Sequence, residues 1–420
     1  MAMRTAVIGT GADTDDPDRT GYAMAYRHAP GYRRLDGVEL VACADIVREN
    51  AESFADSFDI RPEHVYEDYE EMLEGAEPDV VSVCVPPAIH ADIVVDCAES
   101  GIPLAIHCEK PMATTWGDCR RMVEVCDREG VQLSINHQRR FGAPFTRAKS
   151  LIDDETIGDL DRIEFGEVNL SDAAVHQFDL AGYFADWSPV EWVLAGADFS
   201  EENEWFGTRH EHQGIAQWYT ESGVHGIASS GEEPGTGAEF VGCYMRLIGT
   251  DGTIELGVED GPHLRYRTDG GWNAVDTGES IHRPQPGKLR MGLGKIAERS
   301  PLGDKHTFVP TSFVERAIEE VVEALREDRE PVISGEQSLY AAELPFAAWE
   351  SVRRGGRVTL PLAIEDNPLE ELVDGAADES GAAPEGEAAD AEAVDAEAVD
   401  TDAEADGGDA DDSTTSSASE

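Results

Sequence analysis

The chain contains very little lysine for its size. Five of its 420 residues are lysine, against 27 arginines and 87 acidic residues, and the formal net charge is −55. The lysines are Lys110, Lys149, Lys288, Lys295 and Lys305. A surface field of this sign repels phosphate groups, so it argues against nucleic acid or an anionic membrane as a partner.

Long apolar runs and paired cysteines are also missing. No segment approaches the roughly 18 uncharged apolar residues that a membrane helix needs. Residues 5–8 read as a buried strand rather than part of a signal peptide, so we expect a cytoplasmic protein. The seven cysteines form no Cys-x-x-Cys pair. Their placement predicts buried, reduced thiols and argues against a disulfide framework or a metal site.

Acidic residues are concentrated at the C-terminus but are not confined to it. Residues 374–420 hold 17 acids and no lysine or arginine, which leaves −38 on residues 1–373. Such an acidic, lysine-poor surface is typical of halophilic proteins, because concentrated salt screens its self-repulsion. We predict that residues 371–420 are a disordered, solvating tail, since few apolar groups offset the entropy of ordering. A tail that binds a partner is the alternative.

Strand-like and helix-like segments alternate through residues 1–135. Buried-strand patterns lie at 4–8, 39–44, 79–85, 104–108 and 132–135. Helix-length segments separate them, which predicts an α/β fold with a doubly wound parallel sheet. The first helix is expected over residues 21–29, where Pro30 would end it.

A second, α+β domain is predicted for residues 136–370. Strand-like segments with glycine-rich turns dominate residues 162–270, and helices are expected at 312–327 and 336–354. We expect the last helix to pack back on the first domain.

A glycine turn follows the first predicted strand. Gly9 and Gly11 fit a dinucleotide-binding G-x-G-x-x-G turn, but residue 14 is threonine and the next glycine is Gly21. We infer that residues 13–19 are inserted before this third glycine. The two glycines would let amide groups face a pyrophosphate, while the inserted aspartates bulge outward. An ordinary tight turn and a cation-binding loop are the alternatives.

Asp45 ends the second predicted strand. At that position a carboxylate accepts hydrogen bonds from the ribose hydroxyls of NAD and repels the 2′-phosphate of NADP. Arg48 lies close enough in sequence to keep NADP possible. Capping of the following helix is the other interpretation of Asp45.

Two further motifs carry side chains suited to proton transfer. Lys110, in His107-Cys-Glu-Lys-Pro111, follows a predicted strand, and its ammonium can hydrogen-bond a substrate hydroxyl. Asp172 and His176 would share one face if their segment is helical, so that the acid orients an imidazole base. Asp179 could also face His176. A surface lysine and a structural histidine are the alternatives.

Together these residues resemble the Gfo/Idh/MocA family of oxidoreductases. The resemblance spans about residues 4–362. Its carriers are the glycine turn, Asp45, and the segments 84–111, 136–141, 172–179, 249–256 and 334–362.

The resemblance implies a Rossmann domain followed by an α+β domain with a large open, mostly antiparallel sheet. It implies Lys110, Asp172 and His176 as catalytic residues. The implied cofactor-binding residues are Gly9, Gly11, Gly21, Asp45, Pro86, His90, Glu109, Lys110 and Asn136. Members of the family commonly pair through the second sheet, so we expect a dimer or tetramer.

Two departures from the family pattern concern the cofactor and the substrate. Pro87 stands where the family usually has asparagine, and residues 168–171 replace a glycine run.

His210 and His212, with His225, are expected to line the substrate pocket, with metal binding or solvent exposure as alternatives. Arg139 and Arg140 would bind a phosphate or a substrate acid, with surface or interdomain ion pairs as the alternative.

The function expected is transfer of a hydride between NAD, or NADP, and a secondary alcohol of a sugar, polyol or related carbohydrate. The alternatives are a non-catalytic NAD-binding regulator and an enzyme of the same fold with tightly bound NAD, such as a glycosidase or epimerase.

Overall fold

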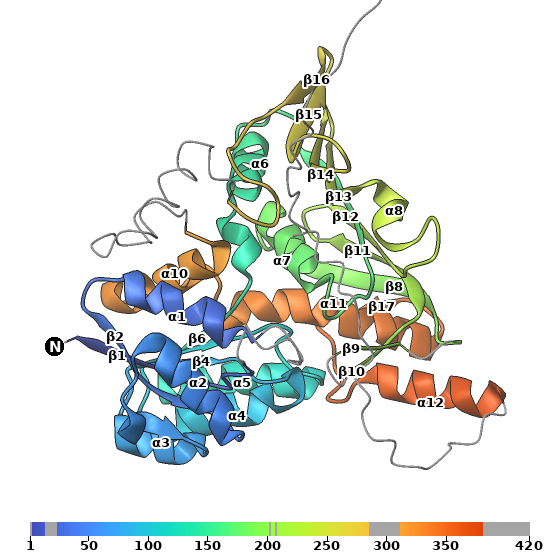
Figure 1. Ribbon diagram of the computed structural model, residues 1–420. Coiled ribbons are helices and arrows are strands. Elements are labelled where there is room, and N and C mark those ends of the chain that lie inside the picture. The colour runs from blue at the N-terminus through green and yellow to red at the C-terminus, as the bar shows by residue number, and fades with distance from the viewer. Residues whose placement is uncertain (1, 13–22, 201–202, 206–207, 285–310, 381–420) are drawn as a thin grey trace, which may run out of the picture. The chain divides into compact units, whose positions relative to one another are not determined.

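The computed structural model describes residues 2–12, 23–200, 203–205, 208–284 and 311–380 (Figure 1). Within them the chain forms two large β-sheets and a two-stranded ribbon of β9 (Asn203–Trp205) and β10 (Thr208–His210). Residues up to 383 form one compact unit, so the domain limits expected from the sequence stay predictions.

The first sheet has six parallel strands in the order β3-β2-β1-β4-β5-β6. The strands are β1 (Met3–Ile8), β2 (Val38–Ala44), β3 (Val65–Tyr66), β4 (Val80–Val83), β5 (Ala105–Cys108) and β6 (Gln132–Ile135). The helices between them are α1 (Ala25–Arg34), α2 (Arg48–Phe58), α3 (Tyr69–Ala76), α4 (His90–Glu99) and α5 (Trp116–Glu129). All residues of β4 and β5 are buried, which explains their continuous apolar runs. The predicted parallel sheet is confirmed, and its strand order reverses between β1 and β4, where such sheets bind ligands.

The first helix differs from the expectation. It begins at Ala25 and continues through Pro30 to Arg34. A Cβ on Gly31 would lie 2.8 Å from Ile318 of α10 (Phe313–Glu327), so the two helices touch at this glycine. Packing therefore extends the helix past the proline, which propensity alone would not allow. The predicted third glycine, Gly21, lies outside the described residues.

The second sheet has nine strands in the order β16-β15-β14-β13-β7-β12-β11-β8-β17. Only β7 and β12 are parallel neighbours, so the described sheet is mostly antiparallel, as expected. The strands are β7 (Leu160–Glu167), β8 (Val190–Asp198), β11 (Gln213–Thr220), β12 (His225–Ser230), β13 (Cys243–Gly249), β14 (Thr253–Val258), β15 (Leu264–Thr268), β16 (Gly271–Ala274) and β17 (Val358–Thr359).

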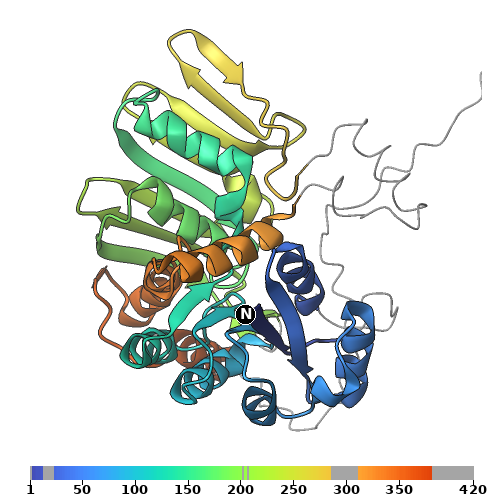
Figure 2. The ribbon, with the colours of Figure 1, turned by 90° about the vertical axis from the view of Figure 1, so that its left-hand side faces the viewer.

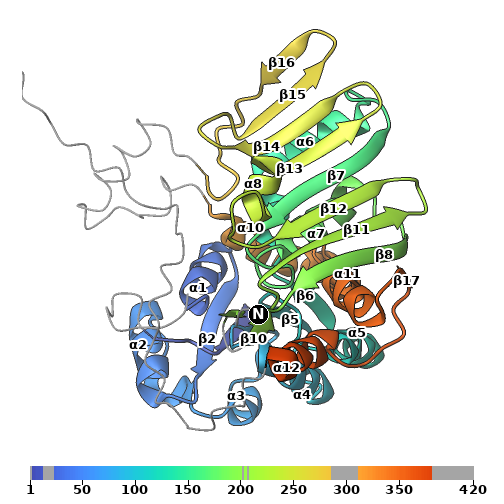
Figure 3. The ribbon, with the colours of Figure 1, turned by 90° about the vertical axis from the view of Figure 1, so that its right-hand side faces the viewer.

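Helices cover one face of this second sheet (Figures 2 and 3). The covering helices are α6 (Ala143–Asp153), α7 (Val175–Phe184) and α11 (Gly335–Arg354), and the short α8 (Gly237–Val241) contacts β7, β12 and β13. The aromatic rings of Phe165, Phe178 and Trp218 meet between α7 and the sheet, with centroids 5.0–5.8 Å apart.

The last long helix packs against elements of the first sheet. Helix α11 contacts α5 and β6. A Cβ on Gly335 would lie 2.8 Å from Leu133 of β6, and the Ile135 amide donates to the Ile333 carbonyl over 3.0 Å. These contacts attach the second sheet's helices to the carboxyl edge of the first sheet.

A helix occupies the start of the predicted disordered tail. Helix α12 spans Pro368–Ser380, ten residues beyond the expected onset of the tail. Leu369 is fully buried and Leu372 and Val373 pack against the core, so apolar contacts extend past the point suggested by composition. Residues 381–420 lie outside the described part.

No helix among the described residues is long and apolar enough to cross a membrane. All seven cysteines are free, and six are buried, as predicted.

Gly226 of β12 provides a test of packing in the second sheet. A Cβ at this position would lie 1.9 Å from the Trp218 ring, which is 1% exposed. We expect Gly226→Ala to lower the free energy of unfolding by about 1–3 kcal/mol, measured by urea denaturation. Gly270→Ala, in the turn between β15 and β16, is the control, because no atom lies within 4 Å of its Cβ position. Equal losses in both variants would contradict this packing.

Candidate active site

The glycine turn is shaped by the close approach of two strand ends. Gly9 and Gly11 have φ angles of +81° and +67°, which favour glycine. A Cβ on Gly9 would lie 2.5 Å from the Val85 side chain and 2.9 Å from the Val85 amide nitrogen. The first glycine is therefore required where β1 meets the segment after β4.

The two turn amides do not face outward as predicted. The Gly9 amide donates to the Ala44 carbonyl over 2.8 Å, and the Gly11 amide donates to Asp45 Oδ2 over 2.9 Å. The start of α1 offers an anion site instead. Its N-cap residue, Met24, makes no side-chain cap with the described residues, and its first turn contains no acid. The Tyr26 and Arg27 amides already donate to the Ala23 and Met24 carbonyls over 3.0 and 2.8 Å, so this helix start suits a pyrophosphate through its dipole rather than through these two amides.

Asp45 holds the glycine turn and the start of the next helix. Its Oδ2 also accepts from the Thr10 hydroxyl over 3.1 Å, and its Oδ1 accepts from the Val47 amide over 2.9 Å. Ile46 beside it is 89% exposed, so an apolar surface adjoins the carboxylate. Arg48 is engaged elsewhere, with Glu52 at 2.8 Å and the Val65 carbonyl at 3.2 Å.

His90 has a structural contact on each side. Its Nε2 lies 2.8 Å from the Val85 carbonyl and its Nδ1 lies 2.9 Å from the Pro111 carbonyl. Burial lowers the pKa of His90, so the neutral ring donates one of these two bonds. The ring thus joins the segment after β4, which includes the exposed Pro86, to the segment after β5. The role implied for His90 in contacting the cofactor is not evident from this geometry.

Glu109 points into the protein. Its Oε1 accepts from His28 Nε2 over 2.7 Å and from Asn136 Nδ2 over 2.6 Å. Burial raises the pKa of Glu109, but the bonds from His28 and Asn136 outweigh it and lower the pKa to about 2. Asn136 Oδ1 is buried and accepts no hydrogen bond from the described residues. Glu109 and Asn136 were both expected to bind the cofactor. Glu109 is instead bonded inside the protein, whereas the Asn136 oxygen has no donor in the described residues.

Lys110 and Asp172 are brought together. Lys110 Nζ donates to the Asp172 carbonyl over 3.1 Å and to Asp172 Oδ1 over 3.2 Å. Their side chains are 22% and 11% exposed, so the ion pair is only partly open to solvent. The pair joins the end of β5 to the turn that precedes α7.

Asp172 and His176 do not share a helix face, because α7 begins at Val175. Asp172 lies in a turn, where the Asn169 side chain accepts from the Asp172 and Ala173 amides over 2.9 Å each. Local hydrogen bonding by Asn169 thus delays the helix start that the spacing suggested.

His176 lies in the first turn of α7 and is 8% exposed. Burial, followed by the positive charges of Lys110 and Arg139, lowers its pKa well below the ordinary value. Its Nδ1 has no hydrogen-bond partner in the described part of the chain. His176 is therefore an uncharged imidazole within electrostatic reach of Lys110.

Asp179 faces away from the role expected for it. It forms a buried ion pair with Arg140, and His137 Nδ1 lies 3.8 Å from its Oδ1. Arg140 also stacks on Trp187. Arg139 donates to the Ile281 carbonyl and to His282. Both arginines are thus bound within the protein, and the Arg140–Asp179 pair is buried inside the predicted second domain rather than at the surface or between the two predicted domains.

His210 joins the site from β10. It is 2% exposed, and its Nδ1 lies 3.1 Å from the Ser171 hydroxyl. Burial, with Lys110 nearby and against the influence of Asp172, lowers its pKa to about 4. His225 does not join it and contacts the rings of Trp192 and Tyr219 instead.

Two neighbouring residues were missed from the sequence. His137 presents its ring edge-on to His176, with centroids 6.0 Å apart. Glu211 is fully buried and accepts from the Leu170 amide over 2.8 Å and from Trp349 Nε1 over 3.0 Å. It therefore ties the turn carrying Asp172 to α11. The alternation of His210, Glu211 and His212 was the available signal for this contact.

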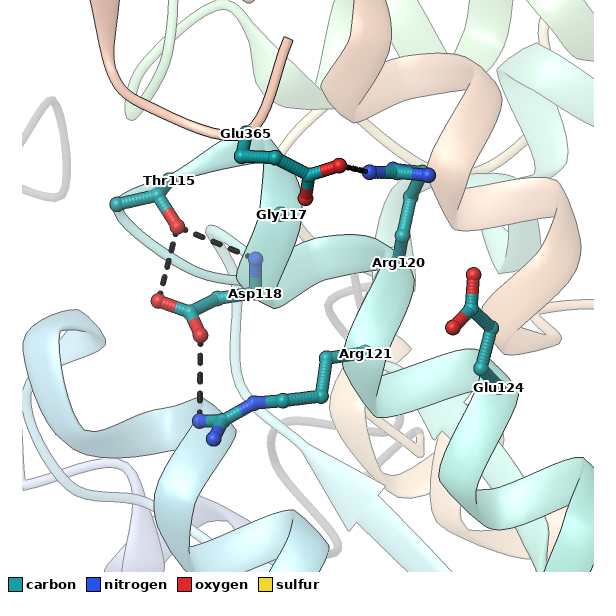
Figure 4. A pocket seen from close by; sticks show the side chains of 7 residues that line it. All are labelled: Thr115, Gly117, Asp118, Arg120, Arg121, Glu124 and Glu365. Carbon is teal, nitrogen blue, oxygen red and sulfur yellow. Dashed lines mark hydrogen bonds and ion pairs between the residues drawn. The ribbon is translucent and has the colours of Figure 1, made fainter. Parts of the chain in front are cut away.

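A surface pocket of about 430 Å³ lies elsewhere, along the start of α5 (Figure 4). Its lining residues are Thr115, Gly117, Asp118, Arg120, Arg121, Glu124 and Glu365. Arg120 pairs with Glu365, and Arg121 pairs with Asp118 and Asp92. Because its charges are paired with each other and it contains none of the residues above, we do not assign it a catalytic role.

The carboxyl edge of the first sheet fits a dinucleotide. It combines the Gly9 close approach, the α1 start, Asp45 after β2 and the vacant Asn136 oxygen after β6. Asp45 suits the ribose hydroxyls, the α1 start suits the pyrophosphate, and the Asn136 oxygen suits an amide donor at the other end.

Known proteins resemble the chain in both parts. The NAD-binding Rossmann fold of an oxidoreductase family matches residues 3–137, and the C-terminal alpha/beta domain of that family matches residues 161–360. Myo-inositol 2-dehydrogenase of Thermotoga maritima is 28% identical over 217 residues, covering 48% of this chain and 60% of that enzyme. D-apiose dehydrogenase of Paraburkholderia graminis is 25% identical over 364 residues, covering 79% of this chain and 86% of that enzyme.

A solved structure shows the same fold. The WlbA dehydrogenase of Bordetella pertussis, in complex with NADH and UDP-GlcNAcA, aligns with a TM-score of 0.62 at 21% identity, covering 86% of this chain and 100% of that one. With both family domains matched in order along the chain, and with an NAD-binding Rossmann domain at its N-terminus, this protein belongs to the Gfo/Idh/MocA family of oxidoreductases.

Proposed function

We propose that the protein oxidises a secondary alcohol of a sugar or polyol with NAD, or catalyses the reverse reaction. The observation that carries the proposal is the Lys110–Asp172 ion pair next to an uncharged His176. These groups lie at the carboxyl edge of a dinucleotide-binding sheet. The similarity to inositol and apiose dehydrogenases supports a polyhydroxylated substrate.

His176 is suited to accept the proton of the reacting hydroxyl. Its ring is uncharged, and Nδ1 has no partner among the described residues, so it can receive a proton without first losing another bond. Two N–H groups of the Lys110 ammonium donate to the carbonyl and carboxylate oxygens of Asp172. The third N–H can then donate to the substrate oxygen. That donor would stabilise negative charge on the oxygen as the proton leaves. When bound, NAD supplies the two-electron acceptor.

Uncharged polar groups around the pair suit a substrate with several hydroxyls. Asn169 Nδ2, Gln177 Oε1 and His210 Nε2 are all buried and without partners in the described residues. Unpaired buried groups are unfavourable, and a polyol supplies both donors and acceptors to pair with them. We place these three side chains in the substrate pocket.

We propose NAD rather than NADP as the physiological cofactor. The Asp45 carboxylate would repel a 2′-phosphate. Arg48 is the positive charge that could have favoured binding of NADP. It donates instead to Glu52 and to the Val65 carbonyl.

Replacing Lys110 tests the catalytic assignment. We expect Lys110→Met to lower kcat by about a hundredfold or more while NADH binding is retained, because the lysine acts on the reacting oxygen. Reduced-nicotinamide formation is followed with NAD and NADP across sugars, polyols and sugar acids, in molar KCl as suits the acidic composition. Lys149→Met is the control, since Lys149 pairs with Asp186 and Asp153 at another place.

The outcome separates the proposed activity from its alternatives. Unchanged turnover in Lys110→Met would contradict the site assignment. A wild-type protein that binds NADH but oxidises no member of the panel would instead favour a regulator or an enzyme with tightly bound NAD.

The pH dependence tests the state of His176. A base must be unprotonated to act, and a lowered pKa moves the loss of activity to lower pH. Burial and nearby positive charge lower the pKa of His176 well below its ordinary value of about 6.5. We therefore expect kcat/KM for oxidation to stay constant as the pH falls through 6.5. Arg139→Gln removes one of those charges and should move the acid limb upward. A wild-type limb at or above pH 6.5 would contradict the assignment.

We propose that a second copy of the chain covers the open face of β8 and β11. Leu194, Ile215 and Tyr219 are 36%, 48% and 36% exposed there. In register, Tyr219 lies opposite Trp192, and their rings stack with centroids 6.1 Å apart. Such a group of exposed apolar side chains, with Gln217 between Ile215 and Tyr219, is typical of a protein interface.

Charge substitution on this face tests the oligomer. Ile215→Glu and Tyr219→Glu are expected to shift the protein from dimer or tetramer to smaller species in sedimentation velocity, because the new carboxylates would be buried without partners. Leu104→Glu, at a 54% exposed position in the first sheet's part of the chain, is the control. A monomeric wild-type protein would rule out this interface.

A further inference from the structure

A buried polar chain runs behind Lys110 from helix α1 to the ends of β5 and β6. The Tyr32 hydroxyl lies 2.7 Å from Ser82 Oγ, and Ser82 Oγ lies 3.0 Å from His28 Nδ1. His28 Nε2 then meets Glu109 Oε1, which Asn136 Nδ2 also meets. Glu109 is 6% exposed and the other four residues are fully buried. The chain therefore crosses the sheet interior and reaches solvent only slightly, at Glu109.

The carboxylate at the centre of this chain is compensated on both sides. Burying a carboxylate is unfavourable unless it is paired and hydrogen-bonded. His28 Nε2 lies 2.7 Å from Glu109 Oε1, and Asn136 Nδ2 supplies a second donor at 2.6 Å. His107, whose ring lies 5.1 Å from that of His28, bonds to Ser134 instead. An apolar core would be easier to build at this place, so the retained charge calls for a reason.

Glu109 controls two neighbours that face the cofactor edge. An ionised carboxylate only accepts hydrogen bonds, so it fixes the NH₂ group of Asn136 inward and turns Oδ1 to the other side. That oxygen is buried and accepts no hydrogen bond that meets the geometric criteria within the described residues, and the His107 ring, whose Nε2 is also unpartnered there, interacts with the same Asn136 side chain. The Lys110 amide lies 3.3 Å from Glu109 Oε2, so the same carboxylate touches the backbone of the proposed catalytic lysine.

The helix that carries His28 is also the one whose start suits the pyrophosphate. His28 and Tyr32 both lie on α1, whose first turn has neither a side-chain cap from the described residues nor an acid. Glu109 and Asn136 directly follow β5 and β6. A bond between His28 and Glu109 thus links the pyrophosphate end of the cofactor site to the opposite end.

We propose that the His28–Glu109 pair is a positioning device for the cofactor, which holds Asn136 Oδ1 as the acceptor for the carboxamide NH₂ of nicotinamide and sets Lys110 relative to helix α1. Neither His28 nor Glu109 contacts the cofactor; they act through Asn136 and Lys110. The inference rests on NAD binding and not on the identity of the substrate.

Two ligands separate this role from a purely structural one. NADH carries the carboxamide, whereas ADP-ribose has the same adenosine, pyrophosphate and ribose without nicotinamide. We expect His28→Gln and Glu109→Gln each to weaken NADH binding about tenfold, measured by fluorescence titration, while the Kd for ADP-ribose, measured calorimetrically, changes less than about twofold. In the double variant the two losses should not add, because both act through one contact.

Tyr32→Phe is the matched control. It removes a buried hydroxyl at the far end of the same chain, 2.7 Å from Ser82, and leaves the bonds to Glu109 in place. It should lower the melting temperature without changing the ratio of the two dissociation constants.

Equal losses for NADH and ADP-ribose, or no loss for either, would overturn the proposal and leave the chain a stabilising network. If a single variant does not fold, the double variant, which buries no charge at this pair, decides by the same ratio. Reduced acetylpyridine adenine dinucleotide, which lacks the NH₂ donor, should bind the wild type and the variants alike. Failure of the sugar dehydrogenase assay would leave all of these binding ratios unaffected.

Discussion

The Lys110–Asp172 ion pair depends on contacts from three separate parts of the chain. Asn169 orders the turn that carries Asp172, and Glu211 holds the Leu170 amide in the same turn. Trp349 of α11 in turn donates to Glu211, and α11 is packed on α5 and β6 of the first sheet. An ammonium on a flexible stem is held by two oxygens only if the turn presenting them is rigid. The active-site geometry therefore rests on the way α11 joins the two sheets.

Burial sets the chemistry around this pair. The outer surface is strongly acidic, but the imidazoles near the site are enclosed, and desolvation lowers the pKa of His137 and His210 to about 4. A histidine whose pKa is lowered in this way stays uncharged at neutral pH, which is the state in which a general base acts. The same enclosure makes every unpaired polar atom unfavourable, and we propose that a bound ligand pairs with the atoms of Asn136, Asn169 and Gln177 that lack partners in the described residues.

Much of the fold could be predicted from short patterns. Alternating strands and helices indicated the parallel sheet, because buried parallel strands need continuous apolar runs and crossover helices. Lys110 was identifiable because lysine is so scarce in this chain. The predicted end of the first helix was wrong: α1 continues past Pro30 because Gly31 allows contact with Ile318, a residue 287 positions away in sequence. Propensity rules carry no information on such a contact.

The candidate site likewise combines features that short sequence patterns predicted with features that only long-range packing decided. Residue types and spacing by themselves determined the family, the dinucleotide turn at Gly9 and the lysine, acid and histidine of the proposed reaction, since each depends on local chemistry within a few residues. Only the tertiary structure decided that Asp172 meets Lys110 from a turn and not from a helix, that Asp179 pairs with Arg140, that Glu109 faces His28, and that His210 joins the pocket. Each of these outcomes is a choice among possible partners for a buried polar group. That choice is made by which groups the packed sheets and helices bring within hydrogen-bonding distance.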